Sequence, residues 1–426
     1  MFPKNCEMGS VGIRSPASMV APDIGYTPNL DKYLARVQRR QQTEHLAKDL
    51  PAGFPAHLSS DLVWDNRIGE TYDWTYELNE AELQEIEDAL KHFQSLRKPL
   101  GFISQETFPL PMLHSTLRRI SSEIHNGRGF KVLRGLPVTR HTREENVIIY
   151  AGVSSHVADI RGRQDIEHEG KPADVVLNHV KNMTMTVDAS RIGAPAFTNE
   201  KQVFHTDAGD LIALFCLEEA EEGGESKLSS SWMVYNELAR SRPDLIRTLA
   251  EPWPFENFTG KGKKCSVRPL LHYIPKTATS PERMIIQYAR RAFTGYLSLP
   301  RSPDIPALSE GQAEALDALH FLSEKHRILL DFKQGDIQYI NNLSIFHARE
   351  GFTDTLEKQR HLIRLWLRDS EYAWPTPEAL KSRWDFVYTG VTPENSVFPL
   401  EPFIRDGGAN GAISKAEDTK STVSKE

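Results

Sequence analysis

Apolar residues recur at every third or fourth position between residues 79 and 94, where the chain has Leu83, Ile86, Leu90 and Phe93. This period places them on one face of an α-helix. Asn79, followed three residues later by Glu82, is typical of a capping box, in which each side chain bonds the backbone N–H of the other residue. The pattern predicts an amphipathic helix that begins beside Asn79.

A second helix and a strand are predicted directly afterwards. Between about residues 110 and 125 one helical face again carries the apolar residues, and Asn126-Gly127 is a suitable helix end. The segment from Phe130 to Leu133 alternates and stops before Gly135, as a strand does. We expect residues 31–125 to form a helical extension that leads into the main domain, residues 126–405.

From residue 200 onward the chain consists of short apolar runs separated by Gly, Pro and Asp: LIALFCL, SKLSSSWMVY, RMIIQYA, DIQYINNLSIF and HLIRLWLR. Strands at this spacing are typical of a β-sandwich or barrel. Helical patterns interrupt them at about 234–250 and 309–328. The sequence therefore predicts one mainly β core with added helices.

The two ends of the chain differ from this pattern. Residues 1–30 are rich in Pro, Ser and Gly without periodicity, and residues 406–426, which end in GGANGAISKAEDTKSTVSKE, are similar. Such composition cannot bury enough apolar surface to fold. We expect a disordered arm and a disordered tail, neither of which carries catalysis.

Composition and charge exclude several classes of protein. A net charge of −7 over 426 residues argues against a nucleic-acid partner, and no stretch is apolar for long enough to span a membrane. The 3 cysteines form no C-x-x-C pair, so no disulfide framework or structural zinc site is predicted. These features favour a cytoplasmic protein with a small-molecule partner, and they leave homo-oligomer formation open.

The first candidate for chemistry is the pair His205 and Asp207. On a strand, alternate residues share a face, so the imidazole and the carboxylate would project together. They would supply two of the three ligands of a 2-His-1-carboxylate iron site. About two His-x-Asp/Glu matches are expected by chance, and a surface pair is the alternative, although this match is the only one among the 15 histidines.

A third ligand is predicted at His347. Gly335-Asp336 indicates a turn, and an apolar strand then runs through Asn341-Asn342 to His347. The alternative is an ordinary core or surface histidine.

Two arginines follow in the run Arg360-His361-Leu362-Ile363-Arg364-Leu365-Trp366. Alternation sets Arg360 and Arg364 on one face of an apolar strand, where buried guanidiniums are costly unless they meet anions. Arginine donates two parallel hydrogen bonds to a carboxylate, so a dicarboxylate ligand would suit this strand. Structural salt bridges are the alternative.

Taken together, these motifs resemble the TauD/TfdA family of Fe(II)/2-oxoglutarate oxygenases, close to its clavaminate-synthase-like fungal branch, over about residues 126–370. The resemblance implies a double-stranded β-helix (jelly-roll, cupin-like) core and the use of Fe(II), 2-oxoglutarate and O2. It also implies that His205, Asp207 and His347 are catalytic and bind the iron.

The resemblance extends to the cosubstrate. It implies that Arg360 binds the far carboxylate of 2-oxoglutarate and that Ser226 contacts the same group. Here Gly-Gly-Glu-Ser stands where the family more often has Gly-Gly-Asp-Thr, which keeps the hydroxyl. Arg364 matches an arginine that in some relatives binds the acidic group of the primary substrate.

The substrate is predicted less directly. If the strand to His347 keeps its alternation, Leu343 and Ile345 line the substrate pocket, whereas a bulge at Asn341-Asn342 would reverse the register. A carboxylate on Arg364 and an apolar body favour a small aliphatic amino acid such as valine, in fungal secondary or amino-acid metabolism by resemblance. Hydroxylation, desaturation and oxidative C–N cyclisation remain open. So do a catalytically silent metabolite-binding β-sandwich, a sulfonate or other acid dioxygenase, and a zinc hydrolase.

Overall fold

The computed structural model describes residues 21–188, 191–257 and 265–404. Most of the expected N-terminal arm and the whole expected C-terminal tail lie outside the described residues. Within the arm, residues 21–29 are described, and they lead into helix α1 (Leu30–Thr43).

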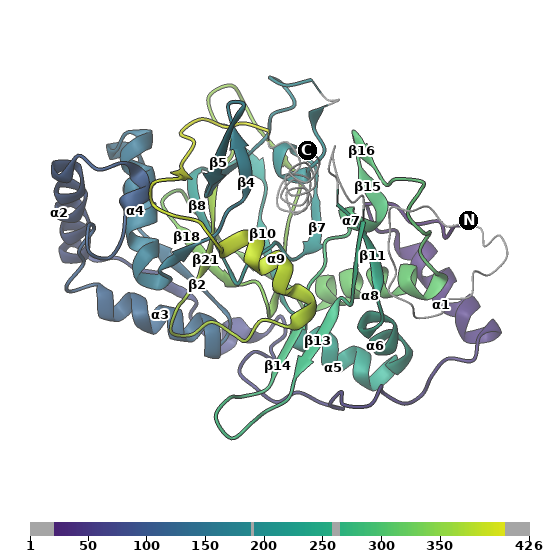
Figure 1. Cartoon of the computed structure of the whole chain (residues 1–426). Coiled ribbons are helices and arrows are strands. Elements are labelled where there is room, and N and C mark those ends of the chain that lie inside the picture. The colour runs from purple at the N-terminus through teal and green to yellow at the C-terminus, as the bar shows by residue number, and fades with distance from the viewer. Residues whose placement is uncertain (1–20, 189–190, 258–264, 405–426) are drawn as a thin grey trace, which may run out of the picture.

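Two facing β-sheets form the centre of the molecule (Figure 1). The larger sheet has the order β1 (Thr75–Glu77), β2 (Phe130–Arg134), β18 (Ile337–Asn341), β8 (Leu211–Glu218), β21 (His361–Arg368), β3 (Ile160–Arg161), with β6 (Leu177–Lys181) also on β21. The smaller sheet has the order β17 (Ile328–Leu330), β10 (Ser226–Ser230), β19 (Ile345–Arg349), β7 (Gln202–His205). The predicted fold class, a mainly β core of the double-stranded β-helix type with added helices, is confirmed.

Strand alternation produces separate apolar layers. In β8, Leu211, Ala213 and Phe215 face the helices outside the larger sheet, whereas Ile212 faces the space between the sheets. The outer face of the larger sheet is covered by α2 (Glu80–Leu96), α3 (His114–Asn126) and α4 (Arg143–Val157). The outer face of the smaller sheet is covered by α5 (Ser231–Ser241), α6 (Pro243–Ala250) and α8 (Glu310–His326). Figure 1 shows these two helical groups on opposite sides of the strands.

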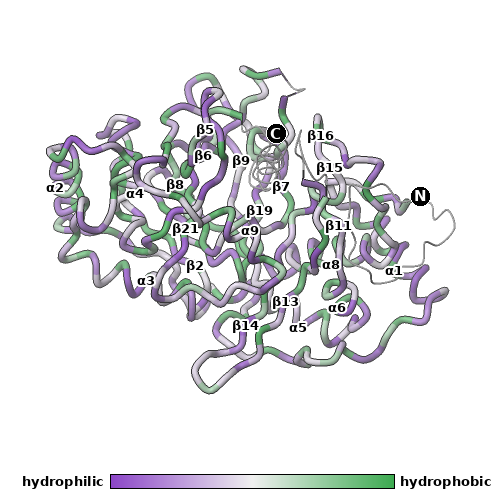
Figure 2. The backbone as a smooth tube through the Cα atoms, in the orientation of Figure 1, coloured by the Kyte–Doolittle hydropathy of each residue, from purple (hydrophilic) through white to green (hydrophobic). Residues whose placement is uncertain are grey.

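The two predicted N-terminal helices are confirmed as α2 and α3. Asn79 accepts from the Glu82 backbone N–H at 3.0 Å and the Glu82 side chain accepts from the Asn79 backbone N–H at 3.0 Å, which completes the capping box. Figure 2 shows hydrophobic and hydrophilic residues alternating along these helices, as expected for elements with one buried face. Helix α4 was not predicted, because nearly all of its residues are buried and it lacks a polar face.

The run DIQYINNLSIF is two strands rather than one. A turn separates β18 from β19, in which the Leu343 backbone N–H donates to Asn341 Oδ1 at 3.0 Å and the Ser344 N–H donates to the Asn341 carbonyl at 3.1 Å. The chain passes from the larger to the smaller sheet here. The run SKLSSSWMVY is likewise split, because β10 ends at Ser230 and α5 begins at Ser231.

Residues 31–125 do not pack as a separate unit. They contribute β1 to the edge of the larger sheet and α2 and α3 to its outer face, while α1 contacts α8 on the opposite side of the molecule. Smaller described elements complete the chain: β4 (Asp165–His168), β5 (Lys171–Val175), η5 (Pro195–Phe197), β9 (Glu222–Gly223), β11 (Trp253–Glu256), β12 (Cys265–Arg268), β13 (Leu271–Ile274), β14 (Arg283–Ile286), α7 (Arg291–Thr294), β15 (Gly295–Tyr296), β16 (Leu299–Pro300), β20 (Phe352–Thr353), α9 (Glu378–Tyr388) and β22 (Ser396–Val397).

Two further observations concern the expected setting of the protein. Among the described helices, none is both long and apolar enough to cross a membrane. Cys216 is a buried free thiol.

Candidate metal centre and its two cavities

The structure brings His205, Asp207 and His347 together between the two sheets. His205 is the last residue of β7, and its register partner on β19 is His347. The rings of the two histidines lie 4.1 Å apart between centroids, and His205 Nε2 lies 3.8 Å from Asp207 Oδ1. One ligand atom from each of the three residues lies within 4.8 Å of the others, which is the arrangement that a single metal ion requires.

Hydrogen bonds to its backbone and to its carboxylate hold Asp207 in place. The predicted strand ends at His205, two residues earlier, so hydrogen bonds rather than a sheet fix this residue. Its backbone N–H donates to Asn342 Oδ1 at 2.8 Å, and Asn342 Nδ2 donates to its carbonyl at 2.9 Å. Its Oδ2 accepts from Arg364 Nη1 at 2.6 Å and from Trp366 Nε1 at 3.2 Å, which leaves Oδ1 facing His205.

The protonation of the three groups suits a divalent metal. Burial lowers the pKa of His347 to about 3 and also lowers the pKa of His205, so both imidazoles are neutral at neutral pH. Burial opposes ionisation of Asp207, but Arg364, the two histidines and the Trp366 hydrogen bond together hold the pKa of this carboxyl well below its ordinary value. Two neutral imidazoles and one carboxylate are ligands in their metal-binding form.

The tautomer of His205 is fixed by its backbone. Nδ1 lies 2.9 Å from the Val203 carbonyl, which only accepts, so Nδ1 carries the proton and Nε2 keeps its lone pair. His347 Nδ1 is buried and has no hydrogen-bond partner among the described residues. An unpartnered buried nitrogen beside a carboxylate fits a metal ligand better than a structural histidine.

Arg360 lies in the same cavity as the three metal-ligand candidates. Its side chain is 6% exposed, and within the described part of the chain no carboxylate forms an ion pair with its guanidinium. Burial lowers the pKa of Arg360 to about 10. The guanidinium packs over the Phe352 ring, and a Cβ at Gly224 would lie 2.9 Å from its Nε, so a glycine is needed there. A buried cation without a counter-ion is costly, and an anionic ligand would remove that cost.

Ser226 also lines this cavity, but its hydroxyl is already used. Ser226 Oγ donates to Gln338 Oε1 at 2.8 Å, whereas Gln338 Nε2 is buried and has no partner among the described residues. Sequence reasoning missed Gln338. Its signal was the alternation of β18, which sets Gln338 on the same inward face as Ile340.

Arg364 lies on β21, and Arg360, the residue immediately before this strand, lines the same cavity, as the alternation predicted. Besides its bond to Asp207, its Nε donates to Gln164 Oε1 at 3.0 Å. Its Nη2 is buried without a partner among the described residues. Arg364 therefore supports the metal-ligand carboxylate and retains one donor for another group.

The structure does not bring Leu343 and Ile345 to the cavity. Leu343 lies in the turn after β18 and packs in the apolar cluster beneath α5 and α8. Ile345 packs between the sheets, with Phe130 and Trp366. The prediction assumed a continuous strand to His347, and the turn after Asn341 removes that assumption. The apolar part of the cavity wall is formed instead by Val180, Ala196, Ile212, Leu214, Ala348 and Leu362.

Two cavities meet at the candidate metal centre. The first extends to Arg360 and Ser226. The second extends to Tyr26, Arg290 and Arg291. Both are lined by Ala196, Gln202, His205, Asp207 and Arg364. One metal ion at this position could thus contact a different small molecule from each side.

Comparison with known proteins agrees with this geometry. The family described as taurine catabolism dioxygenase TauD, TfdA family, matches residues 96–366, which is more than half of the chain. The chain belongs to the TauD/TfdA family. It is accordingly a non-haem iron dioxygenase that uses Fe(II), 2-oxoglutarate and O2. The match begins at residue 96, earlier than the resemblance had indicated.

Individual relatives cover most of the chain. A taurine hydroxylase-like protein, SAT17, from Stachybotrys chartarum is 36% identical over 359 residues, which is 81% of this chain and 89% of the relative. An FR-33289 synthase from Streptomyces rubellomurinus is 22% identical over 72% of this chain and 88% of its own length.

Solved structures show the same fold. An asparagine oxygenase in complex with Fe(II), 2S,3S-3-hydroxyasparagine and succinate has a TM-score of 0.51 at 14% identity, over 70% of this chain and 94% of its own. A mutant of the non-haem iron oxygenase OrfP in complex with (3S)-hydroxy-L-Arg has a TM-score of 0.50 at 14% identity, over 76% of this chain and 99% of its own.

Proposed function

We propose that this dioxygenase oxidises a small carboxylate-bearing substrate, an aliphatic amino acid such as valine, with His205, Asp207 and His347 as the iron ligands. The observation that carries this assignment is the position of Arg360. A buried guanidinium without a carboxylate partner among the described residues lines the same cavity as the three ligands. Arg360 binds the far carboxylate of 2-oxoglutarate there, because its planar fork fits a carboxylate.

Iron(II) held by these residues would supply chemistry in which one O2 oxidises two molecules, 2-oxoglutarate to succinate and CO2 and a C–H or N–H bond of the substrate, with the second oxygen atom leaving in the product or as water. The protein's own residues bind and orient both molecules. Arg364 holds Asp207 in one orientation and offers Nη2 to the substrate carboxylate. Ser226 reaches the 2-oxoglutarate carboxylate only if its hydroxyl leaves Gln338.

The second cavity suits the substrate. Its wall combines apolar residues with the guanidiniums of Arg291 and Arg364, and the apolar residues are Ala194, Pro195, Ala196, Val203 and Ala289. A carboxylate at a guanidinium and an aliphatic body against these residues would leave few C–H bonds beside the metal. The names of the two solved structures, which contain hydroxylated amino acids, support this class of substrate. The site does not favour one outcome among hydroxylation, desaturation and C–N cyclisation.

A second candidate is a sulfonate, because the fungal relative is named as taurine hydroxylase-like. The experiment is to load the purified protein with Fe(II) and 2-oxoglutarate and to measure succinate with each of a panel of L-amino acids and with taurine. Stimulation by an aliphatic amino acid supports the proposal, and stimulation by taurine alone replaces it with the sulfonate. If succinate forms only with iron but none of the tested compounds increases its formation, the protein is an oxygenase that acts on another class of substrate. A protein that forms no succinate would be a silent binding protein.

A further inference from the structure

The N-terminal segment before α1 reaches the second cavity. Tyr26 lines it together with His205, Asp207 and Arg291. Its ring packs edge-on against Tyr296 of β15, with 4.6 Å between centroids. Burial raises the pKa of the Tyr26 phenol, against a backbone hydrogen bond at Val203 and the positive charge of Arg291 and Arg349, so the hydroxyl is neutral and close to these groups. Tyr26 is therefore part of the wall that would contact a substrate.

Two buried arginines hold the backbone immediately before Tyr26. Arg36 Nη2 donates to the Asp23 carbonyl at 2.8 Å, and Arg290 Nε donates to the Gly25 carbonyl at 2.8 Å. The carbonyls on both sides of Ile24 are thus fixed, and Ile24 itself packs against the apolar cluster of the smaller sheet. This attachment leaves the Tyr26 ring little freedom to leave the cavity.

A single carboxylate joins these two arginines. Asp317 of α8 accepts from Arg36 Nη1 at 2.5 Å through Oδ2 and from Arg290 Nη2 at 2.7 Å through Oδ1. The side chains of Arg36, Arg290 and Asp317 are no more than 4% exposed. Removing either partner of a buried ion pair leaves the other charge buried without a counter-ion, which strongly destabilises the folded state. These ion pairs therefore hold the segment before α1 in one position.

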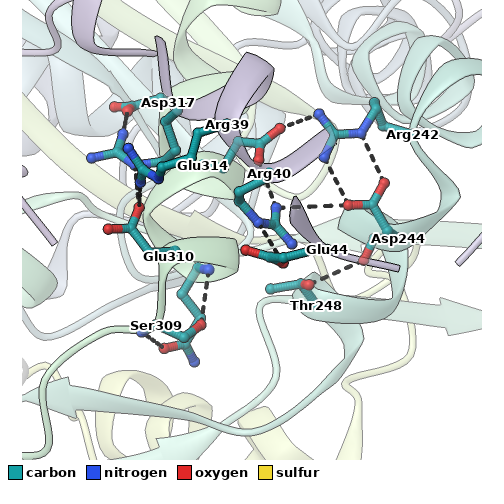
Figure 3. A network of polar contacts seen from close by, with 12 residues as sticks. Arg39, Arg40, Glu44, Arg242, Asp244, Thr248, Ser309, Glu310, Glu314 and Asp317 are labelled. Carbon is teal, nitrogen blue, oxygen red and sulfur yellow. Dashed lines mark hydrogen bonds and ion pairs between the residues drawn. The ribbon is translucent and has the colours of Figure 1, made fainter. Parts of the chain in front are cut away.

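The rest of α1 is fastened to α8 in the same way. Arg40 Nη1 donates to Glu314 at 2.6 Å, and Glu314 also pairs with Arg242, which in turn pairs with Asp244 at 2.7 Å. Figure 3 shows this network between α1, α8 and the start of α6. The segment is therefore attached at several points along its length.

We propose that Tyr26 is a specificity-determining residue of the substrate cavity, and that Arg36 positions it there. The inference rests on the proposed function for the substrate class. It also goes beyond the family match, which begins at residue 96, so the cavity wall includes a residue that lies outside the matched region. The ring limits the length of the amino-acid side chain that fits beside the metal.

The test compares L-valine with the longer L-norleucine as stimulants of succinate formation. Tyr26→Ala should raise the ratio of kcat/KM for L-norleucine to that for L-valine at least tenfold. Arg36→Gln should shift the ratio in the same direction although Tyr26 is intact. Unchanged ratios in both variants would overturn the proposal.

Matched controls come from the same helix. Tyr33 of α1 stacks on Phe321 at 5.1 Å between centroids and does not line the cavity, so Tyr33→Phe should leave the ratio unchanged. Arg39 is exposed and pairs only with Glu310 among the described residues, so Arg39→Gln is the control for Arg36→Gln. A ratio that moves in these controls as well would show a general effect of α1 and would overturn the specific role of Tyr26.

A second measurement does not depend on the substrate. If no amino acid stimulates the wild-type protein, the proposed substrate class is wrong, and Tyr26 is tested by ¹⁹F NMR of protein labelled with 3-fluorotyrosine. Tyr26→Phe assigns the resonance by its disappearance. Replacement of Zn(II) by paramagnetic Co(II) should shift or broaden that resonance strongly. A Tyr26 resonance that Co(II) leaves unaltered would show that the residue does not border the metal cavity, and the inference would then be wrong.

Discussion

Arg364 Nη1 and Asp207 Oδ2 lie 2.6 Å apart, so the arginine predicted to bind the substrate also holds the carboxylate predicted to bind iron. The contact joins β21 of the larger sheet to the residue that follows β7 of the smaller one. The two side chains are 7% and 13% exposed, which protects the pair from solvent screening. The proposed substrate site and the candidate metal centre therefore share one side chain.

Arg364→Met should weaken iron binding as well as turnover. Methionine keeps an unbranched apolar stem but has no donor that could orient Asp207, and loss of a group that orients a metal ligand costs about 10- to 100-fold in metal affinity. Iron per chain after dialysis, measured by mass spectrometry of the metal, gives the affinity. Wild-type iron retention would show that Asp207 is oriented without Arg364.

Arg360→Met should weaken cosubstrate binding and leave iron binding unchanged. Iron retention should match that of the wild type, whereas 2-oxoglutarate binding should weaken by about 2 to 5 kcal/mol, because the far carboxylate loses its charged partner. Calorimetric titration of 2-oxoglutarate into the metal-loaded protein measures this loss. Lys358→Met is the control, since Lys358 is a nearby cation that does not line the cavity of the metal-ligand candidates. Equal effects in the two variants would contradict the assignment.

Ile345→Val should reduce stability and leave the products unchanged. Ile345 is 1% exposed within the core between the sheets, where loss of one methylene costs about 0.5 to 1.5 kcal/mol. Ala196→Val should instead alter the products and leave stability unchanged, because Ala196 lines both cavities and the larger side chain would narrow them. Urea unfolding and mass-spectrometric product analysis of both variants separate the two roles. A product change in Ile345→Val would restore the original expectation for this residue.

His320 should make the folded state sensitive to acid. Burial lowers the pKa of His320 from 6.5 to about 3, so the unfolded chain binds a proton in this pH range that the folded chain does not. The contribution of neutral His320 to the free energy of unfolding is fully present above pH 6.5 and is lost as the pH falls towards 3. The loss is on the order of 2 kcal/mol at pH 5. His320→Gln should therefore show a smaller drop in the free energy of unfolding between pH 7 and pH 5 than the wild type. The exposed His92, changed to Gln, should not alter the drop.

The features that sequence predicted best are those set by local period. Alternation predicted that Arg360, just before β21, and Arg364, on β21, would face the same cavity, and helical spacing located α2 with its cap. The turn after Asn341 was missed because it contains no Gly or Pro, so Asn341-Asn342 was interpreted as a bulge in one strand at most. Tyr26 gave no signal at all, since its importance arises only from partners far away in the sequence.

The long sequence separation between the ion-paired residues of α1 and α8 determines when this contact can form during protein synthesis. Arg36 and its partner Asp317 are 281 residues apart, and Arg40 and Glu314 are 274 apart. At a translation rate of about 5 to 20 residues per second, α1 leaves the ribosome roughly 14 to 56 s before α8 exists. The first described helix of the chain therefore cannot dock in this position before α8 has been synthesised, and the cavity beside the candidate metal centre gains its Tyr26 wall only after that.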